Sequence, residues 1–294
     1  MAHEVPPATT PAQLTARAEA SFAGTPDPRL RLLLERLVHH LHAFATETRL
    51  TPAEWTAAVG FLTRVGQACS PSRQEVVLLS DVLGLSMLVD LLDHDGPPGT
   101  TESTVLGPFY VPGSPERPLG GSIVEGEGYG EPTHISGRVI GAGAGPIEGA
   151  VVDVWQNAAN GRYAVQDPDQ PETNLRGRFR TDAAGRFSFW TVRPTDYPIP
   201  DDGPVGELLR AAARHAWRPA HVHLIVSAPG WRSLTTHLFD DQSAYLESDT
   251  VFGVKDALVC HFVSHGPREP GGPEGHDGTW CSLERDLVLA PVEA

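Results

Sequence analysis

The sequence is poor in cysteine, and its three cysteines form no familiar zinc or redox motif. Cys69, Cys260 and Cys281 make no CxxC pair and no zinc-type spacing. This pattern excludes a disulfide-rich scaffold and indicates reduced thiols in a reducing compartment. Any metal site in this chain must therefore be built from histidine, carboxylate or tyrosine side chains.

Basic charge and long apolar runs are scarce as well. The 294 residues contain 22 basic and 37 acidic side chains, for a net charge of −15. Because phosphate binding needs a basic face, this balance argues against nucleic acid or an anionic membrane as a partner. No apolar run approaches the ~20 residues of a membrane span. The opening MAHEVPPATTPAQ also lacks the features of a secretory signal, so we expect a soluble, cytoplasmic protein.

Residues 11–94 are predicted to be helical. Between residues 30 and 44, apolar side chains recur at helical spacing and predict one broad apolar face. TPAEW is a capping-box signal that begins at Thr51, and SRQE repeats it with Ser72 and Glu75. The second signal opens VVLLSDVLGLSMLVDLL, which is apolar nearly all round. Such a segment predicts burial on several sides, against a second domain or a second subunit.

From about residue 96 the pattern changes to short runs with strand composition. The glycine- and proline-rich connection DGPPGTTESTVLGPFYVPGSPERPLGG comes first, and turns such as DAAG at 182–185 separate the later runs. These runs are HISGRVI, AVVDVWQ, RFSFWTV, HVHLIVS and RSLTTHLF. Short strands without intervening helices indicate an antiparallel sandwich or barrel. We predict an α+β fold: a helical N-terminal domain, residues 1–104, followed by an antiparallel β-sandwich that carries the functional site, residues 105–294.

The segment WRPAHVHLIV, residues 217–226, contains two histidines two positions apart. Side chains i and i+2 of a strand point to the same face, so His221 and His223 present their imidazoles together and can bind one cation. The pair by itself is a weak signal, because two half-exposed sheet histidines have the same pattern. Other HxH sites need a third histidine or a carboxylate on a neighbouring strand.

Two tyrosines upstream, Tyr163 and Tyr197, are further ligand candidates, although two wall residues of the sandwich would look the same. Tyr197 precedes a proline, which favours an extended backbone. The motifs GPFY, VDVWQNAANGRY, RGRFRTDAAGRFSFWTVRPTDYPIP and WRPAHVHLIVSAPGW occur in this order. Together they resemble the intradiol ring-cleavage dioxygenases, the catechol 1,2-dioxygenase group of non-haem iron enzymes, over most of the chain. The resemblance implies one Fe(III) per subunit, bound by Tyr163, Tyr197, His221 and His223.

The chemistry of this donor set agrees with the resemblance. A phenol has a pKa of about 10, so tyrosinate ligation at neutral pH needs a strongly Lewis-acidic cation, and Fe(III) meets that need better than Zn(II) or Fe(II). The resemblance implies that a catechol-type diol binds the iron and that Tyr197 leaves it to accept a substrate proton. O2 then attacks the bound ring, which opens to a muconate-type diacid. Arg218 resembles an arginine of the family that would stabilise charge on the substrate ring, the alternative being a surface arginine ahead of a strand.

The segments SDTVFGVKDALV and LLSDVLG look most similar to the hydroxyquinol 1,2-dioxygenase branch, which cleaves 1,2,4-trihydroxybenzene to 3-hydroxy-cis,cis-muconate (maleylacetate). Catechol or chlorocatechol cleavage is the alternative. Asp81 discriminates between the two substrate classes, because its carboxylate can accept a hydrogen bond from the third hydroxyl of hydroxyquinol. Leaving that acceptor unpaired costs about 1–3 kcal/mol. The alternative is that Asp81 pairs with Ser80 or with backbone. The substrate pocket implied by this branch comprises Leu78, Asp81, Val105, Leu106, Gly107, Pro108, Phe109, Ile199, Pro200, Arg218 and Val251.

His237 stands where catechol-cleaving members carry glutamine, and hydroxyquinol-type members tolerate histidine there. Whether it hydrogen-bonds Arg218 or titrates by itself stays open. The resemblance also implies a homodimer paired through the N-terminal helices, with a lipid-accommodating cavity at the interface. Two other functions compete with a dioxygenase: a non-catalytic sandwich module, transthyretin-like or carbohydrate-binding, and a zinc hydrolase, which lacks a third histidine or glutamate in motif spacing.

Overall fold

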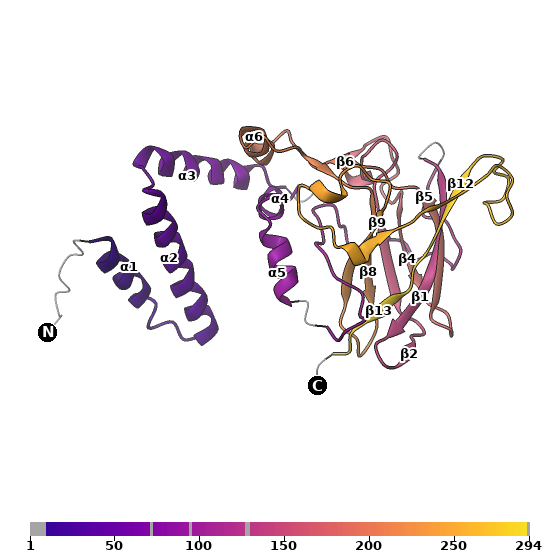
Figure 1. Cartoon of the computed structure of the whole chain (residues 1–294), viewed down its shortest axis with the longest axis horizontal. Helices are drawn as coiled ribbons and strands as arrows, with labels where there is room; N and C mark the ends of the chain where they lie inside the picture. Colours follow the sequence, from indigo (N-terminus) through magenta and orange to yellow (C-terminus); the bar gives the residue numbers. More distant parts are fainter. Residues whose placement is uncertain (1–9, 71–72, 94–95, 127–129, 293–294) are drawn as a thin grey trace. The chain divides into compact units, whose positions relative to one another are not determined.

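The computed structural model describes residues 10–70, 73–93, 96–126 and 130–292. The chain divides into two units, Met1–Arg64 and Val65–Ala294. Helices make up the first unit, and the second combines helices with layered sheets (Figure 1). The predicted α+β fold class is confirmed. No helix within the described ranges is long and apolar enough to cross a membrane.

The first unit is built from α1 (Pro11–Ala20), α2 (Pro28–Thr48) and most of α3 (Pro52–Gln67). The capping box predicted at the start of α3 is confirmed: the Glu54 backbone N–H donates to Thr51 Oγ1 at 3.3 Å, and the Thr51 N–H donates to Glu54 Oε2 at 2.8 Å. Neither α1 nor α2 buries a single residue. The apolar face of α2 is therefore present as predicted, but this chain alone does not cover it.

The helices that lie wholly in the second unit are α4 (Glu75–Val82), α5 (Leu85–Asp93) and α6 (Pro204–Ala211). The predicted capping box at the start of α4 is wrong, because Glu75 is itself the first helical residue and cannot be the third. Ser72 lies outside the described residues. The buried Glu75 carboxylate instead accepts hydrogen bonds from Arg73 Nε, at 2.8 Å, and from the Val205 backbone N–H, at 3.1 Å.

The apolar segment that follows is interrupted, since Gly84 adopts a φ of +75° between α4 and α5. Burial on several sides is not observed within one chain. The exposed apolar side chains of this segment are Val76, Val77, Leu83, Leu85, Leu88, Val89, Leu91 and Leu92. Of the two partners predicted to bury this segment, a second domain and a second subunit, the second subunit stays a prediction.

The strands of the second unit form two main sheets and a short ribbon, with 3-10 turns η1 (Ala164–Gln166), η2 (Leu246–Ser248) and η3 (Asp256–Leu258) between them. The first sheet contains β1 (Pro132–Gly141), β2 (Gly145–Pro146), β5 (Arg186–Val192), β11 (Val263–His265), β12 (Trp280–Glu284) and β13 (Leu287–Leu289). The second has the order β10 (Val259–Cys260), β9 (Leu234–Asp240), β8 (His221–Ser227), β3 (Val151–Trp155), β4 (Arg176–Arg180). The ribbon pairs β6 (Tyr197–Pro198) with β7 (Trp217–Arg218).

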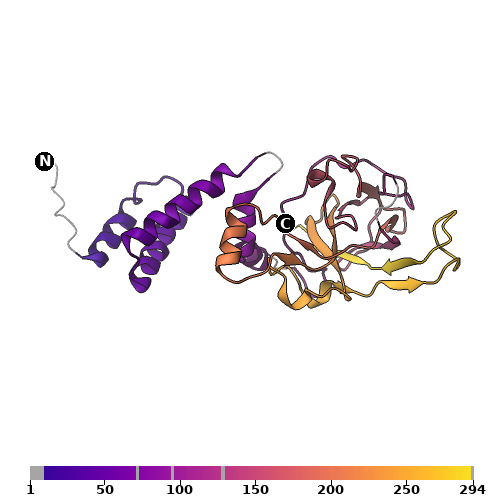
Figure 2. The ribbon, with the colours of Figure 1, turned by 90° about the horizontal axis from the view of Figure 1, so that it is seen from above.

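Most of the pairing is antiparallel, as predicted, but three pairs are parallel. β12 and β13 both run parallel to β1, and β10 runs parallel to β9. The strand-like runs identified in the sequence end before these C-terminal strands, so the parallel edges were not predicted. Parallel neighbours need a long connection, and the chain between β1 and β12 supplies it. β11 and β12 form a hairpin at the edge of the first sheet, and the loop that joins them extends outward (Figure 2).

Alternating apolar residues fill the space between the two main sheets. Ile135 and Phe189 face it from the first sheet, and Val152, Val222 and Leu224 face it from the second. All five are at most 1% exposed. Such sheet-on-sheet burial is the expected driving force of a sandwich. The opposite face of the second sheet stays available for other side chains, and the histidine pair lies there.

Candidate metal centre

Strand β8 carries the two histidines on the face of the sheet that points away from the sandwich core. Val222, Leu224 and Val226 belong to the core cluster, so the alternate residues His221 and His223 point to the other side. Both histidines are buried, with exposures of 0% and 1%. The predicted strand and the predicted alternation of its side chains are confirmed. The alternative interpretation, that the two histidines are half-exposed residues of a sheet, is wrong.

Two tyrosines from separate loops lie against this histidine pair. Tyr163 ends the loop before η1, and Tyr197 lies in the short β6–β7 ribbon. Their hydroxyl oxygens are 3.2 Å apart, and Tyr163 Oη is 2.9 Å from His223 Nε2. His221 Nε2 is 3.1 Å from His223 Nε2. The structure thus brings two phenol oxygens and two imidazole nitrogens into one buried cluster.

The spacing of these four atoms suits a single cation. Donors at about 2.0–2.2 Å from one ion, and at right angles to each other, are about 3 Å apart. The contacts within the cluster, 2.9 to 3.2 Å, have this length. His221 Nδ1 lies 2.6 Å from the Pro219 carbonyl, which can only accept a hydrogen bond. The proton of His221 is therefore on Nδ1, and Nε2 turns its lone pair toward the cluster.

Burial keeps the four donors neutral in the protein without a metal. Burial, the Tyr197 charge and the hydrogen bond to Tyr197 raise the pKa of Tyr163 well above its usual value, although Arg218 opposes this. Burial also raises the pKa of Tyr197, against the charge of Arg218. For His221 and His223, burial and neighbouring positive charge lower the pKa well below its usual value. A cation that binds here must displace phenol protons but finds both imidazoles already deprotonated.

A third histidine, His237, lies on the neighbouring strand β9. The register pairs His223 with His237 on one side and with Trp155 of β3 on the other. Ring centroids are 4.1 Å apart for His223 and His237, and 4.6 Å for Trp155 and His223. The three histidines could hold a metal ion together. A local motif does not indicate His237 or Trp155 as neighbours of the pair, because only the register between the strands brings them beside His223.

His237 makes contacts different from those considered for it in the sequence. Its ring stacks on His221, with centroids 4.4 Å apart and planes 16° apart. It lies near the Val105 backbone, but within the described residues neither ring nitrogen makes a hydrogen bond of normal geometry. Of the two roles left open for His237, the hydrogen bond to Arg218 is therefore not observed. Burial and the charges of His223 and His221 lower the pKa of His237 well below its usual value.

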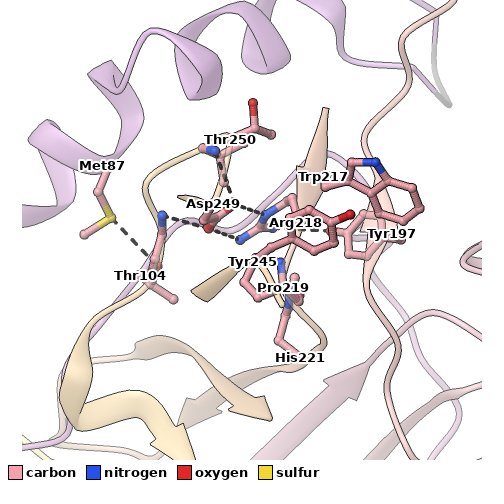
Figure 3. Close-up of polar contacts among 12 residues, drawn as sticks. Met87, Thr104, Tyr197, Trp217, Arg218, Pro219, His221, Tyr245, Asp249 and Thr250 are labelled. Carbon is pink, nitrogen blue, oxygen red and sulfur yellow. Dashed lines mark hydrogen bonds and ion pairs between the residues drawn. The ribbon is translucent and has the colours of Figure 1, made fainter. Parts of the chain in front are cut away.

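Arg218 is a buried residue of the site and not a surface arginine. It is 1% exposed and lies opposite Tyr197 in the β6–β7 ribbon, so its Nη1 reaches 3.3 Å from Tyr197 Oη. Figure 3 shows the guanidinium between Tyr197 and Asp249. Burial opposes its charge, but Asp249 and the tyrosines raise the pKa of Arg218 above its ordinary value. Arg218 is therefore a permanent cation beside the phenols. No local motif indicates Asp249 as its partner, because the two residues lie 31 positions apart.

The predicted pocket residues line two cavities that share Pro108. A cavity of about 690 Å³ is lined by Leu78, Pro108, Phe109, Ile199 and Pro200. A second cavity of about 530 Å³ is lined by Asp81, Val105, Leu106, Gly107 and Pro108. Val251 and Arg218 line neither cavity. Val251 is buried in the same apolar cluster as Leu78, Phe109 and Ile199.

Phe109 and Gly107 connect this pocket to the cluster of donor atoms. The Phe109 ring stacks on Tyr163, with centroids 4.6 Å apart. Gly107 has a φ of +76°, and a Cβ there would lie 3.2 Å from His223 Cε1. Only glycine combines this backbone conformation with so close an approach. The pocket wall therefore packs directly on the candidate ligands.

Asp81 is a buried carboxylate in the wall of the second cavity. It is 2% exposed, and burial raises its pKa, although a hydrogen bond from Ser86 and the charge of Arg218 oppose this. Ser80, the partner considered in the sequence, has its hydroxyl 2.9 Å from that of Ser86. A buried carboxylate in the wall of a cavity can accept a hydrogen bond from a hydroxyl group of a ligand.

Comparisons with known proteins show which family this chain resembles. A family model described as "Dioxygenase" matches residues 105–272, and one described as "Catechol dioxygenase N terminus" matches residues 27–101. The chain is 46% identical over 279 residues to 6-chlorohydroxyquinol 1,2-dioxygenase of Cupriavidus pinatubonensis, covering 95% of this chain and 97% of that protein. It is 47% identical to hydroxyquinol 1,2-dioxygenase of a Rhizobium species, covering 90% of each. The crystal structure of hydroxyquinol 1,2-dioxygenase from Pseudomonas putida DLL-E4 superposes with a TM-score of 0.87 at 45% identity, covering 96% of this chain and 99% of that one.

Proposed function

This chain belongs to the intradiol ring-cleavage dioxygenase family, and from that premise we propose that it is a ferric enzyme that cleaves hydroxyquinol between adjacent hydroxyls with both atoms of O2. The observation that carries the proposal is the buried cluster of two phenol oxygens and two imidazole nitrogens at 2.9 to 3.2 Å contacts. The product would be 3-hydroxy-cis,cis-muconate or its tautomer maleylacetate. Catechol or chlorocatechol is the alternative substrate class.

We assign the iron to Tyr163, Tyr197, His221 and His223. The donor set supports a trivalent ion, because only a strong Lewis acid displaces protons from two phenols whose pKa burial has raised. When bound, the ferric ion supplies the Lewis acidity that deprotonates and orients the diol oxygens. One ion per subunit fits a single such cluster.

Tyr197 is the proposed base. It lies opposite Arg218 in the ribbon, and burial raises the pKa of its phenol, so that a released tyrosinate readily takes a proton from the diol. Arg218 keeps its positive charge within 3.3 Å of that oxygen. From this position it can stabilise the negative charge that develops on the substrate ring.

Asp81 supports a trihydroxylated substrate. Its buried carboxylate lines a cavity whose wall combines apolar residues such as Val105 and Leu106 with polar ones such as Thr104. A third ring hydroxyl that donates to Asp81 would satisfy an acceptor which catechol leaves unpaired, at a cost of about 1–3 kcal/mol.

A homodimer and a lipid contact are the proposed partnerships of the helices. Leu33, Leu37, Leu41 and Phe44 of α2 are each between 50% and 56% exposed. A folded helix seldom leaves so large an apolar stripe in water, so a second copy or a lipid chain is expected to cover it. The three free cysteines support a reducing compartment, the cytoplasm, as the location.

Zinc is the alternative metal, favoured by the three-histidine group His221, His223 and His237. Elemental analysis and colour separate the two. The ferric enzyme should be burgundy from tyrosinate-to-iron charge transfer, contain one iron per chain and consume O2 with hydroxyquinol. A colourless zinc protein, or a fully active protein without iron, would refute the proposal. A tenfold preference in kcat/KM for catechol would refute the substrate assignment alone.

A further inference from the structure

Arg218 is held by a carboxylate that lies outside the set of residues assigned above. Its Nε and Nη2 atoms face Asp249 Oδ1 and Oδ2 at 3.2 and 3.3 Å, and the two side chains are 1% and 2% exposed. Figure 3 shows this two-point contact, with Tyr197 on the other side of the guanidinium. The geometry leaves Nη1 free to approach Tyr197 Oη.

The backbone around Asp249 holds the carboxylate in place. The Val251 N–H donates to Oδ1 at 3.2 Å, and the Gly253 N–H donates to Oδ2 at 3.0 Å. Phe252 adopts a φ of +60° to close this turn. A Cβ at Gly253 would lie 3.0 Å from Arg218 Nη2, so the turn packs tightly on the guanidinium.

The turn is also tied to neighbouring segments. Thr104 Oγ1 donates to the Gly253 carbonyl at 2.7 Å. Arg214 donates to the carbonyls of Val82, at the end of α4, and Thr250, at 2.6 and 2.8 Å. The position of Asp249 is thus determined by several elements, and through it that of Arg218.

We propose that Asp249 is a positioning residue, an inference that rests on the proposed function. Asp249 orients Arg218 and balances its charge. The guanidinium can then interact with the substrate and does not pair tightly with the Tyr197 phenolate. Without this carboxylate, the buried guanidinium would still lie 3.3 Å from the Tyr197 oxygen and would pair with that phenolate. A closer cation stabilises the phenolate, which makes Tyr197 a weaker base and raises the energy of its charge transfer to iron.

The test compares Asp249→Asn with Asp240→Asn in the iron-loaded protein. Asp240 is 3% exposed and forms another two-point contact, with Arg193 Nε and Nη2 at 2.7 and 3.2 Å, so it controls for the loss of a buried carboxylate from an ion pair. For Asp249→Asn we expect one iron per chain, kcat lower by about 100-fold with a smaller change in KM, and a charge-transfer band at shorter wavelength. For Asp240→Asn we expect lower stability with kcat and the band unchanged.

A double-mutant cycle tests whether Asp249 acts through Arg218. Adding Asp249→Asn to Arg218→Lys should change kcat little beyond Arg218→Lys alone, since the residue that is positioned has already been replaced. Additive losses would overturn the inference. So would an Asp249→Asn variant that loses its iron, or one whose kcat and band match those of Asp240→Asn. Failure of the proposed function appears separately, in a wild-type protein without iron or O2 consumption, and overturns both.

Discussion

The affinity for Fe(III) should rise with pH at a rate set by the two tyrosines. Burial raises the pKa of Tyr163 and Tyr197 above the usual value of about 10, so both phenols carry protons in the metal-free protein at neutral pH. The pKa values of His221 and His223 are lowered from about 6.5, so these ligands carry none. Binding through all four groups therefore releases two protons, and affinity falls as pH falls.

The expected slope is two units of log affinity per pH unit. The free energy of binding should thus change by about 2.7 kcal/mol per pH unit, because one proton contributes about 1.4 kcal/mol. Histidines with an ordinary pKa would steepen the slope toward four below about pH 6.5. Since burial keeps these two neutral, the slope should remain two there.

The assay is a competition titration of the metal-free protein with a ferric chelate, followed by the tyrosinate charge-transfer band and corrected for the chelator's own protonation. Tyr197→Phe should reduce the slope to one. Tyr245→Phe is the matched control, since this tyrosine stacks on Trp217 and not on the cluster, and it should leave the slope at two. A wild-type slope of one or less would refute tyrosinate ligation by both residues, and a slope near four at pH 6 would refute neutral histidines.

Three further outcomes are expected. Asp81→Ala should lower kcat/KM for hydroxyquinol relative to catechol by about 5- to 150-fold, the equivalent of one buried hydrogen bond of about 1–3 kcal/mol, and equal losses for both diols in steady-state assays would contradict its role. Phe179→Ala removes a fully buried ring that stacks on Phe189 and should lower the free energy of unfolding by about 3–5 kcal/mol in urea titrations, and a loss below about 1 kcal/mol would be inconsistent with this packing. Leu37→Asp with Phe44→Asp should convert a dimer to a monomer by light scattering, since both side chains lie on the exposed stripe of α2; an unchanged mass would place the interface elsewhere.

Local sequence patterns predicted much of the fold, because helices and strands depend on short-range periodicity. The segments RFSFWTV and HVHLIVS coincide with β5 and β8. The cap at Thr51 was predictable for the same reason. The signal at Ser72 failed, since Glu75 is held by tertiary contacts with Arg73 and Val205 that a local motif does not include.

The candidate site likewise combines features that local sequence predicts with features that only tertiary contacts create. Alternation along one strand is enough to place His221 and His223 on one face, and the motif order related the two tyrosines to them. By contrast, His237 joins the histidine pair through the register between β8 and β9. Asp249 lies 31 residues further along the chain than Arg218, and it reaches Arg218 from a turn in which Phe252 has a positive φ. Residue order therefore carries the identity of the donor atoms, whereas strand register and loop packing create their common position, because contacts between distant segments form only when the whole second unit folds.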